Sequence, residues 1–164
     1  MTETTKDGGT ADTQRHGRRI MMTADERDAF LTVQRTCRVA TVSENGAPHI
    51  GALWFVWDDT ALWLYSLTRS KRWRQLRNDP RLSVVIDDGE AYGELRGVEL
   101  SGRALFVGEA PRTGQPCPEL DVPERLFASK YFDTESMPHD GRHAWLRLVP
   151  DSAVSWDFRK MPRG

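Results

Sequence analysis

Hydrophobic and polar positions follow two different periods along the chain. Near the N-terminus, Thr23 and Glu26 form a capping-box pattern that opens a predicted helix ending at about Arg35. After this helix the period falls to two, and turn residues such as Asn45-Gly46 separate the runs, which is typical of antiparallel strands. The predicted strands cover residues 38–42, 49–57, 61–66, 81–87, 94–108 and 143–158.

The two longest predicted strands contain residues that disturb a regular sheet. Gly97 and Gly102 lie in the fifth run and predict bulges or bends there, because glycine has no side chain to pack on a sheet. Pro150 and Asp151 interrupt the sixth run and predict either one distorted strand or a strand pair.

Two further short helices are predicted between the strands. One follows Ser70 and stops before Pro80, and the other runs from Pro123 to about Tyr131. Six strands with two to three short helices predict a mainly β fold, a six-stranded antiparallel barrel that is closed or split.

The N-terminal part of the chain differs in composition from the rest. Residues 1–20 are polar, rich in glycine and threonine and without periodicity, which predicts a disordered extension. Residues 21–164 contain the predicted elements, with no linker and no internal repeat. We therefore expect them to form a single domain.

The composition narrows the classes of function. A formal charge of -1 argues against a nucleic-acid-binding surface over the whole chain. No apolar run reaches the length of a membrane span and no apolar leader is present, so we expect a cytoplasmic protein without a membrane partner. Cys37 and Cys117 lie far apart, and the histidines show no ligand spacing, so neither a disulfide nor a metal site is predicted. The motifs of kinases and of serine hydrolases are also absent from the sequence.

The helix after Ser70 begins with cations at the unfavourable end of its dipole. Ser70 is a good N-cap, but Lys71 and Arg72 follow it, where the macrodipole favours acidic side chains. The preceding strand ends with the hydroxyls of Ser66 and Thr68 close to the same point. Two interpretations stand: the turn holds an anion such as a phosphate, together with free backbone N–H groups, or the helix is a solvated basic surface.

The order of these segments resembles a known family. A hairpin, a strand ending in YS (65–66), the turn SKR (70–72) and the segment NDPRLSVVI (78–86) are similar, at this spacing, to the pyridoxamine 5'-phosphate oxidase superfamily of FMN-binding split barrels. The resemblance covers about residues 24–160 and implies a split barrel that forms a homodimer with the cofactor at the interface. It implies that the cofactor phosphate is held by Ser66, Ser70, Lys71 and Arg72. It also implies that the isoalloxazine ring is lined by Ile50, Gly51, Ala52 and Leu53.

Two departures from the family pattern argue against pyridoxamine phosphate as the substrate. Ile50 stands where the oxidase has an arginine, and the C-terminal Arg-x-His motif that binds the substrate phosphate has no counterpart. The segments RGVELSGRA (96–104) and AVSWDFRKMPRG (153–164) are more similar to the actinobacterial branch that uses the deazaflavin coenzyme F420. That resemblance implies hydride transfer from reduced F420 to a small organic acceptor such as an enone, an imine or a quinone.

Other functions stay open from the sequence. One is an FMN-dependent oxidoreductase of the pyridoxamine phosphate oxidase type, and another is a non-enzymatic protein that binds a flavin, a deazaflavin or heme. Trp156, followed by Arg159 and Lys160, is interpreted either as an aromatic plane beside the cofactor or as a core residue. No catalytic residue is assigned, because a flavin-type ring carries the hydride while the protein binds and orients it.

Overall fold

The computed structural model describes residues 17–162, so most of the extension predicted at 1–20 lies outside the described residues. Its helical elements are η1 (Arg18–Ile20), α1 (Ala24–Val33), α2 (Lys71–Asn78), η2 (Tyr92–Glu94), η3 (Pro118–Leu120), α3 (Asp121–Phe132) and η4 (Phe158–Lys160). Its strands are β1 (Thr36–Val42), β2 (Pro48–Trp57), β3 (Leu62–Leu67), β4 (Arg81–Asp88), β5 (Arg96–Val107) and β6 (His143–Asp157).

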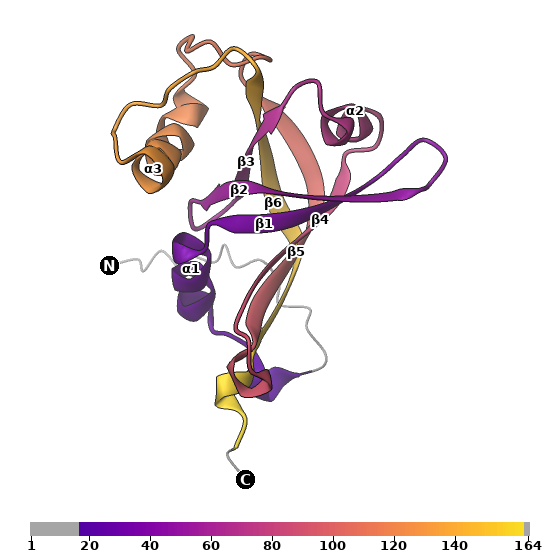
Figure 1. Ribbon diagram of the computed structural model, residues 1–164, viewed down its shortest axis with the longest axis vertical. Coiled ribbons are helices and arrows are strands. Elements are labelled where there is room, and N and C mark those ends of the chain that lie inside the picture. Colours follow the sequence, from indigo (N-terminus) through magenta and orange to yellow (C-terminus); the bar gives the residue numbers. More distant parts are fainter. Residues whose placement is uncertain (1–16, 163–164) are drawn as a thin grey trace, which may run out of the picture.

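The six strands form one closed barrel in the order β1-β2-β3-β6-β5-β4 (Figure 1). Each neighbouring pair is antiparallel. This confirms the predicted mainly β, six-stranded fold. β5 and β6 are the longest strands, and they continue downward in Figure 1 to the end of the molecule that carries η2 and η4.

Each of the three α-helices covers a different part of the barrel. The capping box of α1 is present as predicted, with Thr23 and Glu26 each bonded to the other's backbone N–H. Buried residues of α1 and α2 pack into the core inside the barrel, which includes Leu31, Leu76 and Phe55. A second cluster, built around Trp63, Phe127, Leu120 and Trp145, lies under α3. Within residues 17–162, no helix combines the length and the apolar character that a membrane span requires.

The β5–β6 pairing explains the residues that disturb the sequence pattern. β6 is one continuous strand, and the register shifts between Ser101 and Gly102, which pair with Ser152 and Pro150. Asp151 is therefore the extra residue of a bulge, and the strand-pair alternative was wrong. A bulge at Gly97 was also wrong, because Gly97 pairs in regular register with Trp156.

A buried arginine attaches the 108–120 connection to α3. Arg112 is 4% exposed, and its guanidinium donates to Glu109 at 2.8 Å and to Glu124 at 2.6 Å. Glu124 also accepts from the indole N–H of Trp145 at 3.0 Å. Burial opposes the ionisation of Glu124, but these donors outweigh it and lower the pKa of this carboxyl. The network holds α3 against the outer side of β6.

Replacement of Gly97 by alanine should destabilise the fold. A Cβ at this position would lie 2.3 Å from Cζ2 of Trp156 and 2.9 Å from the backbone oxygen of Ile86. Overpacking of this kind costs about 1–3 kcal/mol, so urea denaturation should show a free energy of unfolding that is lower by this amount. Gly93→Ala is the matched control, since a Cβ there meets nothing within 4 Å. Equal effects of the two substitutions would contradict the close packing of the indole on Gly97.

Candidate functional site

The candidate site is built around a gap between β2 and β3. These two strands pair only where Phe55, Val56 and Trp57 meet Leu64, Trp63 and Leu62. β2 nevertheless pairs with β1 from Trp54 back to Pro48. Among the described residues, segment 48–54 of β2 therefore has a strand partner on one edge only. In Figure 1, β3 leads away from this segment toward α2.

The side chain of Arg72 occupies this gap. Its guanidinium donates to the hydroxyl of Ser66 from Nε at 3.3 Å and from Nη2 at 3.1 Å. Burial lowers the pKa of Arg72, and within the described residues no carboxylate pairs with it. A half-buried cation with a neutral hydroxyl as its side-chain partner is costly unless an anion joins it. The structure thus brings together Ser66 and Arg72, two of the residues that the family resemblance assigned to the cofactor phosphate.

Gly51 is the third member of this contact. A Cβ at Gly51 would lie 3.1 Å from Nη1 of Arg72, which is tighter than an ordinary van der Waals contact. The absence of a side chain on β2 therefore leaves room for the guanidinium. Gly51, Ser66 and Arg72 come from β2, β3 and α2, and they form what we call the cradle.

The N-terminus of α2 adds donors beside the cradle. The hydroxyl of Ser70 accepts from the N–H of Trp73 at 3.1 Å, which confirms the predicted N-cap. No acidic residue lies in the first turn of α2. Trp73 is buried and packs edge-on against Phe106 at 4.8 Å, so the helix start is held firmly. Free helix N–H groups, two hydroxyls and a desolvated guanidinium form a donor set that suits a phosphate group.

Lys71 lies on a different side of the helix from Arg72. Its side chain is exposed and lines a groove of about 590 Å³ between α2 and the β1–β2 hairpin. Arg74 of α2 and Ser43 and Asn45 of the hairpin line the same groove. Successive helix residues are about 100° apart around the helix axis, so the neighbouring side chains of Lys71 and Arg72 lie on two different surfaces.

The other predicted residues of β2 and β3 have different environments. Ile50 is 65% exposed and Ala52 is exposed on the same outer face, whereas Leu53 points inward and packs against the barrel core. The hydroxyl of Thr68 donates to the carbonyl of Arg142 at 3.1 Å, so it serves the connection between β3 and β6. The sequence placed the Thr68 hydroxyl beside the turn but did not reveal this backbone partner.

Trp156 does not join the cradle of its own chain. It pairs with Gly97 of β5. The residue of β5 that lies next to the end of α2 is Arg103, which pairs with Arg81, and Arg103 is six residues along the strand from Gly97. At the rise of a β-strand this separation is about 20 Å. The indole lies across β5 at Gly97, where a Cβ would meet it.

A buried polar link between α2 and the hairpin was missed by the sequence interpretation. The hydroxyl of Thr41 donates to Oε1 of Gln75 at 2.6 Å, and it lies 3.4 Å from Nδ1 of His49. Thr41 and Gln75 are both buried. The only signal in the sequence was a glutamine on the apolar side of the helix, between Trp73 and Leu76.

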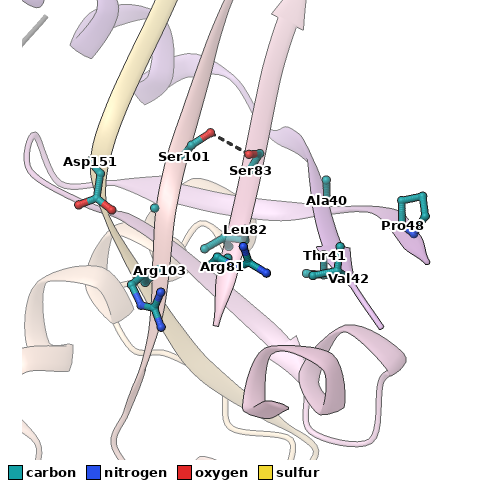
Figure 2. A pocket seen from close by; sticks show the side chains of 11 residues that line it. Ala40, Thr41, Val42, Pro48, Arg81, Leu82, Ser83, Ser101, Arg103 and Asp151 are labelled. Atoms are coloured by element: carbon teal, nitrogen blue, oxygen red, sulfur yellow. Dashed lines mark hydrogen bonds between the residues drawn. The ribbon is translucent and has the colours of Figure 1, made fainter. Parts of the chain in front are cut away.

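A second pocket lies on the outer face of the sheet and shares no residue with the cradle (Figure 2). It has a volume of about 520 Å³ and an apolar floor of Ala40, Val42 and Leu82. Ser83 and Ser101 share a hydrogen bond of 2.7 Å at its upper edge in the view of Figure 2. None of the residues predicted to bind the cofactor lines this pocket. Within residues 17–162, no group of His, Cys, Asp and Glu side chains is arranged to hold a metal ion.

The thiol of Cys37 should be unreactive although it lies near the cradle. Burial raises its pKa to about 12, and the charge of Arg72 offsets only part of this effect. We expect Ellman's reagent at pH 8 to react with one thiol of the native protein, the half-buried Cys117, and with two after denaturation. Cys117→Ser should abolish the native reaction and Cys37→Ser should leave it unchanged. Two rapidly reacting native thiols would contradict the burial of Cys37.

Comparisons with known proteins agree with this fold. A conserved hypothetical protein from Mycobacterium tuberculosis is 29% identical, with 92% of this chain and 96% of that chain covered and a TM-score of 0.75. A FAD-binding protein from Mesorhizobium loti is 21% identical over 82% of this chain and 94% of its own, with a TM-score of 0.63. A structure described as an F420 reductase is 21% identical over 77% of this chain and 94% of its own, with a TM-score of 0.57. No curated protein matches the sequence.

The matching family is described as pyridoxamine 5'-phosphate oxidase, and its model covers residues 23–157. These residues contain all six strands and the three α-helices. The chain is therefore a member of the pyridoxamine 5'-phosphate oxidase family of flavin-binding split barrels.

Proposed function

We propose that this protein is an oxidoreductase that uses a flavin-type cofactor, with the deazaflavin F420 as that cofactor. The observation that carries the proposal is the half-buried guanidinium of Arg72. It packs over Gly51, has the hydroxyl of Ser66 as its side-chain partner, and has no carboxylate partner within the described residues. A cofactor phosphate would supply the missing negative charge. The family membership and the fold shared with an F420 reductase support this choice.

Each part of the site has a role in this proposal. Ser66, Ser70 and Arg72 hold the phosphate, and Lys71 adds positive charge from the side of the hairpin groove. The open edge of β2 from Ile50 to Leu53 supports the ring through backbone groups that have no strand partner. When bound, reduced F420 supplies a hydride to an enone, an imine or a quinone. The chain orients the cofactor and limits the access of water to it.

We also propose that the protein acts as a homodimer with the cofactor at the interface. The outer face of the sheet carries small and apolar side chains on neighbouring strands, namely Pro48, Ile50, Ala52, Ala40, Val42, Val85 and Val154. Arg38 and Glu99 also lie on this face, so it is the exposed apolar cluster, not the whole face, that favours burial against a second copy. Trp156 lies on the same face, and a two-fold arrangement would let the indole of one protomer approach the cofactor of its partner.

Cofactor titration tests the proposed function. The purified protein should quench the fluorescence of F420 on binding, and Arg72→Ala should weaken binding by about 1.5–3 kcal/mol, the usual value of a hydrogen bond to a charged group. The double variant Lys71→Ala/Arg72→Ala should lose about 2–5 kcal/mol if both side chains contact the phosphate. Arg77→Ala is the matched control, because this exposed arginine lies at the far end of the same helix.

The same titration distinguishes the alternatives. Tight binding of FMN without binding of F420 would replace the deazaflavin with a flavin, and purification with a heme spectrum would overturn the oxidoreductase proposal. Unchanged affinity in the double variant would mean that the basic turn is a solvated surface. Oxidation of reduced F420 by a quinone or an enone, followed by absorbance, is the activity expected of the loaded protein.

A charge on the outer sheet face should separate the proposed dimer. Ala40 lies on β1 between Ile50 and Ser83, so Ala40→Glu places a carboxylate in the middle of the face. Sedimentation velocity should show a dimer for the unmodified protein and a monomer for this variant, because an unpaired buried charge is costly. Ser129→Glu, exposed on α3, is the control that should remain dimeric. A monomeric unmodified protein would contradict the proposal.

A further inference from the structure

Two exposed aromatic rings meet where β2 passes the C-terminal end of α3. Trp54 is 44% exposed and Phe132 is 46% exposed, and their rings lie 6.3 Å apart at 73°. Trp54 also stacks on Tyr131 at 4.4 Å with an interplanar angle of 10°. We call Trp54 and Phe132 the aromatic corner. Exposed rings held at a steep angle offer one flat face and one edge to a planar apolar molecule.

The aromatic corner has a rigid support. The hydroxyl of Tyr131 donates to the carbonyl of Phe55 at 2.6 Å and lies 2.7 Å from the carbonyl of Arg35. These contacts fasten the end of α3 at the point where the β1–β2 ladder stops. Because Tyr131 is fixed, the Trp54 ring that stacks on it is also fixed, and little ordering is needed when a ligand binds.

Two cations lie beside the corner without a counter-charge. The guanidinium of Arg35 is 5.9 Å from the centre of the Trp54 ring and donates to the carbonyl of Lys130 at 3.2 Å. The ammonium of Lys130 lies 4.6 Å over the ring of Phe55 and 3.5 Å from the carbonyl of the same residue. In the described part of the chain, neither cation forms an ion pair.

The electrostatics of this pair favour an anionic ligand. Burial and the neighbouring charge of Arg35 lower the pKa of Lys130 to about 8. Two nearby cations repel each other, and one of them is partly removed from water. A carboxylate or sulfonate between them would offset both costs.

The position of the corner relates it to the proposed cofactor site. Ile50, Ala52 and Trp54 alternate along β2 and share its outer face. Trp54 is two residues from Ala52, or about 7 Å along the strand. The cradle lies at the α2 side of this segment and the corner at its α3 side, so a ligand on the corner lies against the end of a ring supported by β2.

We propose that the aromatic corner, with Arg35 and Lys130, is the binding site of the electron acceptor, and that this acceptor is a planar apolar molecule carrying an anionic group. This assignment to the acceptor rests on the proposed function. The rings of Trp54 and Phe132 would contact the apolar plane of the acceptor, and the side chains of Arg35 and Lys130 would bind its anionic group. The site therefore selects aromatic acids over small neutral enones.

The binding part of this proposal can be tested without the cofactor. 8-Anilinonaphthalene-1-sulfonate is a planar apolar anion, and N-phenyl-1-naphthylamine is its neutral analogue. Fluorescence titration of Arg35→Gln should show a loss of affinity of about tenfold for the sulfonate and little change for the neutral probe. Trp54→Ala should weaken both probes. Arg38→Gln is the matched control, because Arg38 is an exposed arginine three residues after Arg35, on β1, that already pairs with Asp87 at 2.6 Å.

The outcomes separate this site from the cradle. Arg35→Gln should retain its F420 affinity within about twofold, whereas Arg72→Ala should lose it. Equal sulfonate affinity in the unmodified protein and in both corner variants would overturn the corner as a site, whether or not F420 binds. A loss of F420 affinity in Arg35→Gln would overturn its assignment to the acceptor. If F420 fails to bind any variant while the probes behave as expected, the proposed function falls and the anion-binding corner stands.

Discussion

The arrangement of the site depends on one uncompensated charge, the guanidinium of Arg72 in the gap between β2 and β3. A barrel with complete ladders would have no room for this group. Here β2 and β3 part after Phe55 and Leu64, and Gly51 omits the side chain that would fill the space. Ser66 gives the guanidinium a neutral partner but no negative charge. The fold thus keeps a partly desolvated cation ready for an anion, which is the reverse of what stability alone would favour.

The same strand connects this charge with the aromatic corner. β2 pairs with β1 from Pro48 to Trp54, so the outer residues of this segment are held in one row although its other edge is open. Ile50, Ala52 and Trp54 follow one another on that row. α2 stands at one end of the row and α3 at the other, and buried contacts fix both helices, Trp73 for α2 and the Arg112 network for α3. A single open strand between two fixed helices suits a cofactor and a second molecule placed end to end.

The long β5–β6 ribbon has a separate role in the architecture. Its bulge at Asp151 changes the register without breaking the strand, and Gly97 lets the indole of Trp156 lie flat on the sheet. Trp156 is thereby directed to the outer face, far from the cradle of its own chain. A cofactor site that needs this ring must therefore draw it from a second protomer. The position of Trp156 therefore bears on the cofactor site only if the protein forms the proposed homodimer.

The sequence by itself determined the barrel and the N-cap at Ser70, because alternation and capping are local properties of the chain. The bulge site at Gly102 was visible for the same reason. The contact between Ser66 and Arg72 came from the structure, although the family resemblance had assigned both residues to one phosphate site. Only the tertiary structure decided that Lys71 and Arg72 lie on different surfaces, that the Thr68 hydroxyl bonds to the backbone, and that Trp156 lies across β5 on Gly97. It alone brought together Arg35 from the segment before β1, Trp54 from β2 and Lys130 from α3. Contacts between residues so distant in sequence depend on strand register and helix docking, which leave no pattern in any short stretch of the chain.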